Sequence, residues 1–350
     1  MKKLLEIAHR MDDYACMWNG VEDLYIRDTG ETLPPKFFYV LSGFGSFCYM
    51  KTPKAELKRM VALGDGRTRQ MYEFLAPIVD FDYKICEYKT FEKALAKIKS
   101  EIDAGFPCMI GALDMFYLPH FEKLYHKEHI PFHYELITGY DDTEKLLYFS
   151  DCGREDTQLI SYDDLRLAMD CSYPGLSKPN TVWTIRMHTS KRKYEIAKEA
   201  FARKKELFLH PPVGFIGCRG FEKFIKELPH WKSELTHEDY DKQLYQMVQF
   251  FGTVPTVPNA LRGIGEPDSI AFGGGFDKAA VVLESLGKEY HDKAMLAASE
   301  IFRRAVPVIG QIKENIVDYL TGKKDETEQL PLLFSQVADI MKAGFETLPL

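Results

Sequence analysis

The chain has 350 residues, which is enough for two domains of ordinary size. Its 45 lysines and arginines and 52 aspartates and glutamates give a net charge of −7, and 45% of its residues are hydrophobic. These values are typical of a globular protein and exclude a disordered, collagen-like or fibrous chain. The acidic balance argues against a nucleic-acid partner, and no apolar run approaches the ~20 residues of a membrane-spanning helix.

Seven cysteines are spread along the chain without a CxxC pair. An odd number at wide spacing disfavours a disulfide framework or a zinc knuckle. Near the start, Glu6 and Arg10 interrupt the apolar core that a signal peptide would need. Both features predict a cytoplasmic protein in which most thiols are small buried side chains.

The first half of the chain mixes helical and strand-like patterns. Residues 16–25 place apolar side chains on one helical face, and Asp12 and Asp13 are available to cap this helix. The other elements predicted here are a helix at 91–104, a buried strand at 108–113, a hairpin formed by 134–140 and 146–150 around a polar turn, and a strand at 181–187.

After about residue 190 nearly every pattern is helical, so we predict one domain over residues 1–190 and a helical domain over 191–350. Pro307 is expected to kink or split the longest helix. Residues 252–275 are rich in glycine and proline and exceed the ~12–15 residues usual for a structureless connection, which suggests a functional or mobile segment. The helices are predicted at 191–208, 217–228, 238–251, 276–320 and 329–346.

Several common catalytic signatures are absent. The chain has no GxxxxGK[ST], GxSxG, HExxH or complete GxGxxG sequence, so we predict no nucleotide cofactor and no α/β-hydrolase site. Gly43 and Gly45 on either side of Phe44 predict a tight passage of the backbone, which is either a plain turn or a close approach of substrate or another strand.

Three histidines have the spacing of one helical face. His126, His129 and His133 would share that face in an unbroken helix, but Pro131 argues against such a helix. No ligand cluster lies nearby in the sequence. We therefore interpret these histidines as surface residues near a strand entrance and predict no metal.

Cys16, His133 and Asp151 have the composition of a nucleophilic thiol site, which needs a thiolate, a base and a group that orients the base. Cys16 lies in the first turn of its predicted helix, where backbone amides and the helix dipole favour a negative sulfur. If the hairpin turn centres near residues 142–143, opposed residue numbers sum to about 285, which puts Asp151 beside His133 across the ladder. Spacing alone leaves a structural role for each residue open.

The order of these residues resembles that of papain-like and bacteriocin-processing peptidases. More narrowly, three stretches resemble the N-terminal domain of the butirosin biosynthesis protein H family. The helical remainder, with three glycines before a long helix, is similar to the uncharacterised helical domain that often follows it. The three stretches are SGFGSFCY at 42–49, GFP at 105–107 running to DMFYLP at 114–119, and FHYELITGYD at 132–141.

The resemblance implies a cysteine-dependent acyltransferase. An acyl or aminoacyl group would pass from an acyl-carrier-protein thioester to Cys16 and then to the amine of a small acceptor. His133 would be the general base and then the acid, and Asp151 would orient and stabilise the imidazolium. Candidates for lining the substrate pocket are Gly43, Phe44, Gly45, Asp114 and Tyr117.

We therefore expect an α+β protein with a papain-like N-terminal domain and an all-α C-terminal domain. The helical domain and residues 252–275 would keep water from the acyl-enzyme. Two alternatives stay open from the sequence. One is a peptidase or amidase that uses the same three residues, and the other is a binding protein that kept the fold and lost the chemistry.

Overall fold

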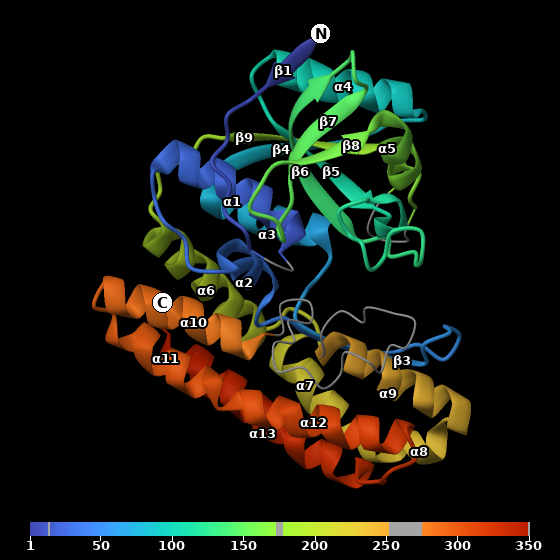
Figure 1. Ribbon diagram of the computed structural model, residues 1–350. Helices are drawn as coiled ribbons and strands as arrows, with labels where there is room; N and C mark the ends of the chain where they lie inside the picture. The colour runs from blue at the N-terminus through green and yellow to red at the C-terminus, as the bar shows by residue number, and fades with distance from the viewer. Residues whose placement is uncertain (13–14, 173–177, 252–274, 349–350) are drawn as a thin grey trace. The chain divides into compact units, whose positions relative to one another are not determined.

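The computed structural model describes residues 1–12, 15–172, 178–251 and 275–348 (Figure 1). It divides into two compact units, one formed by Met1–Phe38 and Arg67–Lys193 and the other by Tyr39–Gly66 and Tyr194–Leu350. The first contains a large sheet and the second is mostly helical, which confirms the α+β class. No helix in the described ranges is long and apolar enough to cross a membrane. Residues 252–274, predicted to be a functional segment, lie outside the described residues.

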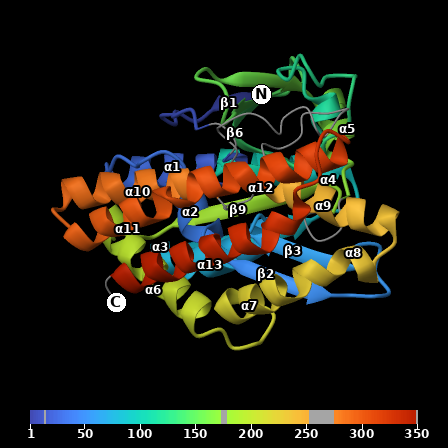
Figure 2. The same cartoon turned by 90° about the horizontal axis from the view of Figure 1, so that it is seen from below.

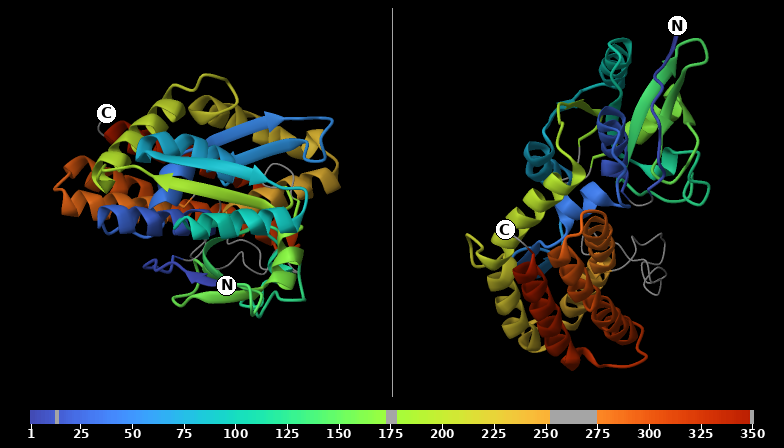
Figure 3. Two further views of the ribbon diagram at one scale, coloured as in Figure 1. Left: turned by 90° about the horizontal axis from the view of Figure 1, so that it is seen from above. Right: turned by 90° about the vertical axis from the view of Figure 1, so that its left-hand side faces the viewer.

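The first unit is built around a seven-stranded sheet whose pairings are all antiparallel. The strand order is β4-β9-β5-β6-β7-β8, and β1 pairs with β6. The antiparallel β4 and β9 are seen side by side in the left view of Figure 3. The strands are β1 (Lys2–Leu4), β4 (Phe81–Glu87), β5 (Cys108–Leu113), β6 (His133–Asp141), β7 (Leu146–Ser150), β8 (Gln158–Ser161) and β9 (Thr181–Met187).

Helix α1 (Cys16–Thr29) packs closely on the centre of this sheet. A Cβ atom added at Gly20 would lie 2.6 Å from the Met109 sulfur on β5 and 2.7 Å from Cβ of Leu136 on β6. The absence of a side chain at Gly20 therefore permits the close approach of helix and sheet. The helix ends at Gly30, which adopts the left-handed conformation with φ 71°.

The opposite face of the sheet is covered by α4 (Phe91–Asp103) and α5 (Tyr162–Met169), while α3 (Thr68–Val79) follows the return of the chain into this unit. Ile98 and Ile102 of α4 share one buried cluster with Ile110 and Ile137 of the sheet. Side chains alternate along a strand, so Ile110 points away from the face that Met109 presents to α1. The predicted helix at 91–104 and the strands at 108–113 and 181–187 are confirmed to within one residue.

The second unit includes a segment that the sequence analysis placed in the N-terminal domain. Strands β2 (Phe47–Lys51) and β3 (Arg59–Leu63) pair with each other as a separate two-stranded sheet. Phe47 stacks on Phe221 of α7 with ring centroids 3.8 Å apart, and the Tyr49 hydroxyl donates to Glu227 at 2.6 Å. The unit boundary therefore differs from the single cut near residue 190, because this aromatic hairpin is buried against helices that come much later in the chain.

The helix predicted at 276–320 is three helices, and Figure 2 shows α12 and α13 running side by side. Asp292 caps the second helix by accepting from the amides of Ala294 and Met295, a start signal that the sequence analysis missed. Pro307 lies in the first turn of the third, where its missing N–H costs no helical hydrogen bond. The α-helices that remain are α2 (Phe37–Gly43), α6 (Lys193–Leu209), α7 (Gly217–Glu227), α8 (Trp231–Glu234), α9 (His237–Phe251), α10 (Phe276–Glu289), α11 (Lys293–Arg303), α12 (Ala305–Leu320) and α13 (Leu330–Thr347).

Replacing Gly20 by alanine should separate α1 from the sheet, since the new methyl group would overlap Met109 and Leu136. We expect Gly20→Ala to lower the free energy of unfolding by about 1–3 kcal/mol, measured by urea unfolding followed by circular dichroism. Gly310→Ala in α12 is the matched control because nothing lies within 4 Å of its added Cβ. It should leave stability unchanged or raise it by up to ~1 kcal/mol, and equal losses in the two variants would contradict this packing.

Candidate active site

The β6–β7 hairpin brings the two ends of its strands together on one face. Its ladder pairs Leu136 with Ser150 and Ile137 with Phe149, and continuing this register puts residue 135 opposite residue 151. The predicted hairpin is confirmed, but its register at this end is displaced by one residue. A bulge at Thr138 changes the register by one residue: Ile137 pairs with Phe149 before the bulge, and Gly139 pairs with Tyr148 after it.

His133 and Asp151 form a buried ion pair at this end of the hairpin. Nε2 of His133 lies 2.5 Å from Oδ2 of Asp151, whose Oδ1 accepts from the Gly153 amide at 2.9 Å. Burial opposes the charge on both groups, but their mutual attraction and hydrogen bonds raise the pKa of His133 well above 6.5 and lower the pKa of Asp151 below its usual range. The carboxylate therefore orients the ring and stabilises its protonated form.

Cys16 begins α1 beside this pair. Its Sγ lies 3.8 Å from the carbonyl oxygen of Phe132, and its hydrogen bond with His133 is one of the interactions that raise the pKa of that imidazole. Because Nε2 of the ring faces Asp151, Nδ1 is the nitrogen left for the thiol. The structure thus brings the three predicted residues together. Helix α1 has no side-chain cap, and Asp13, one of its two predicted caps, lies outside the described residues.

The segment that leads into α1 crosses the end of the hairpin. The Asp12 amide donates to the carbonyl of Cys152 at 2.8 Å. The ring of His9 bridges further, with Nε2 2.9 Å from the carbonyl oxygen of Asp151 and Nδ1 2.6 Å from a carboxylate oxygen of Asp23 on α1. These contacts join the helix that carries the thiol to the residues that follow β7.

Asp12, the other residue predicted to cap α1, belongs instead to a buried charge network. Its carboxylate accepts from the Lys36 amide at 2.6 Å and from Lys36 Nζ at 2.8 Å. Next to it, Glu22 accepts from Arg10 Nη2 at 2.6 Å and from the Phe38 amide at 2.7 Å. The network holds residues 10–12 against α1 and against residues 36–38.

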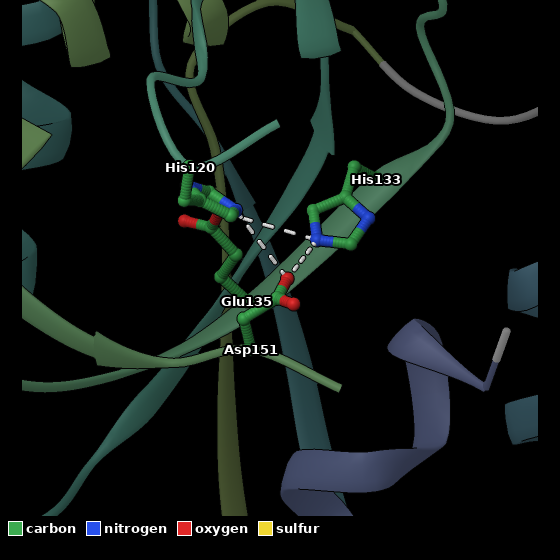
Figure 4. A group of neighbouring side chains, drawn as sticks. All are labelled: His120, His133, Glu135 and Asp151. Atoms are coloured by element: carbon green, nitrogen blue, oxygen red, sulfur yellow. Dashed lines mark hydrogen bonds and ion pairs between the residues drawn. The ribbon is translucent and has the colours of Figure 1, made fainter. Parts of the chain in front are cut away.

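Two further side chains, His120 and Glu135, complete the corner around the ion pair (Figure 4). Nε2 of His120 lies 3.3 Å from Oε1 of Glu135 and 3.5 Å from Oδ2 of Asp151. Burial and the nearby Asp151 carboxylate raise the pKa of Glu135 to about 8 against the attraction of His133. Burial lowers the pKa of His120 despite its proximity to Asp151.

Sequence reasoning missed both of these residues. Glu135 could have been predicted from the sequence, because it lies two residues after His133 on the same strand and its side chain must point to the same face of the sheet. No sequence pattern pointed to His120, since it lies in an irregular stretch between η1 (Met115–Tyr117) and β6. One donor atom from each of His120, His133, Glu135 and Asp151 lies within 4.8 Å of the others, so this set has the composition and spacing to hold a metal.

Of the predicted pocket residues, Asp114 and Tyr117 lie in the first unit. Asp114 organises the loop before β6, since its carboxylate accepts from the amides of Phe116 and Ile130 at 3.1 Å and from His129 Nδ1 at 2.6 Å. Tyr117 ends η1 and packs against the ring of Phe116 with centroids 4.9 Å apart. These contacts show a structural role, and their place in a substrate pocket stays a prediction.

Gly43, Phe44 and Gly45 belong to the second unit. Phe44 is buried, with ring centroids 5.0 Å from Phe302 and 6.1 Å from Phe345. Gly45 has φ 82°, and an added side chain there would collide with the Phe345 ring. The tight passage predicted at these glycines is therefore an approach to an aromatic core.

The three histidines considered as a metal set do not share a helix. No α-helix occurs among residues 118–132, all of which the structure describes. His129 pairs with Asp114 and stacks on Phe116 at 4.1 Å, and His126 stacks on the same ring at 5.3 Å. His133 turns instead toward Asp151.

The residues of this site lie in a stretch of the chain that matches a known protein family. Residues 15–152, which include Cys16, His133 and Asp151, match the family described as butirosin biosynthesis protein H, N-terminal. The chain therefore contains a butirosin H-type N-terminal domain. This confirms the resemblance predicted from the sequence and relates the chain to a family of biosynthetic enzymes.

The butirosin H-type domain is followed by a second match. Residues 163–254 match a domain of unknown function, DUF4872. That range begins in α5 and continues through α6, so it crosses the boundary between the two structural units. No curated protein matches the chain.

Removing one partner of the buried Asp12–Lys36 pair should be costly. We expect Lys36→Met to lower the free energy of unfolding by up to roughly 3 kcal/mol, because it removes the buried ammonium 2.8 Å from Asp12 and leaves that carboxylate, among the described residues, only its 3.3 Å contact with the less buried Arg10 as a charged partner. Arg27→Met is the control, since Arg27 pairs with Asp28 at the surface of the same unit and such pairs contribute at most ~1 kcal/mol. Urea unfolding compares the two, and an equally small loss for Lys36→Met would show that the network is dispensable.

Proposed function

We propose that this protein is a cysteine acyltransferase that moves an acyl or aminoacyl group from an acyl-carrier-protein thioester to an amine of a small acceptor. The observation that carries the proposal is the grouping of Cys16, His133 and Asp151 within a butirosin H-type domain. A thiol, an imidazole that contacts it and a carboxylate that orients the imidazole are the parts that nucleophilic thiol chemistry needs.

In the first half-reaction, the Cys16 thiolate attacks the thioester carbonyl and the bond from that carbonyl to the carrier sulfur breaks. His133 gives its proton to the departing thiolate. In the second half-reaction, the acceptor amine attacks the acyl-enzyme, loses a proton to His133 and expels the Cys16 thiolate as the amide forms. Asp151 keeps the ring in place through both steps, since its bond to Nε2 leaves Nδ1 directed to the sulfur.

The negative oxygen that forms in each step needs hydrogen-bond donors. Cys16 stands at the first position of α1, where helix amides lack an intrahelical carbonyl partner and the helix dipole favours negative charge. We assign one oxyanion donor to the backbone N–H of Cys16. Loss of a single donor of this kind costs about 3 kcal/mol of transition-state stabilisation in known enzymes.

A papain-like arrangement of the first unit is part of the proposal. The supporting feature is a helix that begins with the nucleophile and packs on an antiparallel sheet, while one hairpin of that sheet supplies the imidazole and the carboxylate. The three side chains come from the start of α1, the start of β6 and the residue that follows β7, so each lies on or directly beside a regular element. Catalysis requires support of this kind, because the reacting atoms must be held to within a fraction of an ångström.

Alkylation of the thiols tests the nucleophile without knowledge of the substrate. At pH 7 iodoacetamide should modify Cys16 before Cys108 and Cys171, because the thiolate is the reactive form and burial raises the pKa of Cys108 above its usual range and that of Cys171 to about 12. Peptide mapping by mass spectrometry follows each site over time. His133→Ala should slow the modification of Cys16 alone. Equal rates at Cys16 and Cys108 in the wild-type protein would refute an activated thiol.

Acyl transfer itself can be followed with a short-chain acyl thioester of a carrier protein. We expect the mass of the wild-type chain to increase by one acyl group at Cys16, and added amines to discharge it as amides. Cys16→Ala should abolish both steps, and His133→Ala should slow them by about 10²–10⁴-fold, the scale of general acid–base catalysis. Lys36 lies outside the triad, but its loss affects folding, so Arg27→Met serves as the folded control.

The product distinguishes transfer from hydrolysis by the same three residues. Release of free acid at a rate that no amine changes would identify a peptidase-type or amidase-type enzyme and refute the transferase. Absence of any acyl-enzyme, together with an unreactive Cys16, would identify a binding protein of this fold.

A further inference from the structure

The corner behind the ion pair contains buried polar atoms that the protein does not satisfy. Both carboxylate oxygens of Glu135 and both ring nitrogens of His120 are buried and make no hydrogen bond of good geometry among the described residues; His120 Nε2 has only the longer contacts with Glu135 and Asp151. The Glu135 residue is 1% exposed. Buried polar atoms are nearly always paired in folded proteins, and such an exception in a native structure points to an ion or a water that belongs there.

Apart from the His133–Asp151 hydrogen bond of 2.5 Å, these atoms are spaced about as far apart as ligands around one metal ion, and no pair exceeds 4.8 Å. The His120 Nε2 to Glu135 Oε1 distance is 3.3 Å, the His120 Nε2 to Asp151 Oδ2 distance is 3.5 Å and the His133 Nε2 to Glu135 Oε1 distance is 4.0 Å. Four tetrahedral ligands at about 2.1 Å from a zinc ion lie about 3.4 Å apart. Figure 4 shows the four side chains directed toward one another, with dashed lines joining neighbouring polar atoms.

The elements behind these ligands hold them in place. His133 and Glu135 stand on β6, and Asp151 follows β7 with its Oδ1 fixed by the Gly153 amide at 2.9 Å. The His120 ring is packed between Phe121 and Phe149, with centroids 4.3 Å and 5.1 Å away. Two imidazoles and two carboxylates form a nitrogen and oxygen set that suits Zn²⁺ and related transition metals.

We propose that His120, His133, Glu135 and Asp151 form a site for a divalent transition metal of the zinc class. Ligation uses Nε2 of His133 and an oxygen of Asp151, which are the atoms that hold each other 2.5 Å apart in the ion pair. A metal must separate them to enter, so the bound metal and the catalytic pair exclude each other. This second consequence, inhibition by the metal, rests on the proposed function, whereas the binding site does not.

Zinc binding to the full chain, kept reduced with a phosphine, is measured by competition with a chromophoric chelator. We expect one tight site in the wild-type protein. Glu135→Gln and His120→Ala should each weaken it at least tenfold, the scale on which even outer partners of a metal site act. His129→Ala is the matched control, because this exposed histidine pairs with Asp114 outside the corner. Circular dichroism confirms that each variant is folded.

A thiol site is the main competitor, since the chain has seven cysteines. Cys16→Ala should retain the tight zinc site, because no thiol is among the four ligands. Loss of zinc binding in Cys16→Ala with full binding in Glu135→Gln would assign the metal to a thiol and imidazole pair and overturn the proposal. Wild-type affinity in both Glu135→Gln and His120→Ala would overturn it as well. Glu135→Gln alone decides the question if His120→Ala does not fold.

Inhibition is measured as the change in the rate of Cys16 alkylation when zinc is added. This change is determined separately for the wild-type protein and for each variant. Zinc should slow the reaction in the wild-type protein and have at least tenfold less effect at the same concentration in Glu135→Gln. Inhibition that is equal in both proteins would refute the exclusion. Failure of acyl transfer leaves the binding measurement intact, so the two proposals can fail separately.

Discussion

The site depends on a short length of backbone that fastens the start of α1 to the end of the β6–β7 hairpin. The Asp12 amide donates to the Cys152 carbonyl, and His9 spans from the Asp151 carbonyl to Asp23 on the helix. The entropy of closing a loop grows only with the logarithm of its length, so a few buried hydrogen bonds, each contributing about 1 kcal/mol, suffice to keep distant segments together. This crossing adds to the packing of α1 on β6, where Gly20 approaches Leu136, and the two together locate Cys16.

Buried charged groups hold this segment in place. Asp12, Glu22, Arg10 and Lys36 exchange short hydrogen bonds with one another and with neighbouring amides. Burying an ion pair adds little stability compared with apolar packing, but leaving one partner alone is costly. Directional bonds of this kind also do not permit the small sliding that apolar contacts tolerate. The network therefore contributes more to the precise placement of α1 than to the overall stability of the fold. A site with three side chains from separate elements requires such placement.

Local patterns predicted the hairpin and the neighbourhood of His133 because alternation and turn residues act over a few positions. They placed the turn too early and did not reveal the bulge at Thr138, so the predicted register near His133 was wrong by one residue and missed that Glu135 lies opposite the acid. His120 reaches the corner from a stretch with no period, and only tertiary packing places it. The same limit explains the domain boundary: Phe47 has the pattern of any core strand, and its pattern does not reveal that residues 39–66 are buried against later helices.

The two carboxylates of this corner, Asp151 and Glu135, differ in their hydrogen bonding. Both oxygens of Asp151 are hydrogen-bonded, to His133 and to an amide, whereas Glu135 has, within the described residues, only longer contacts of Oε1 with His120 at 3.3 Å and His133 at 4.0 Å. Glu135 cannot gain the imidazole of His133 without taking it from Asp151, so a proton or a cation is left to satisfy it. A proton links at best one oxygen to His120 across 3.3 Å, while a metal ion engages Glu135 and His120 together. His133 is thus the residue on which both chemistries meet, and its Nε2 can serve only one of them at a time.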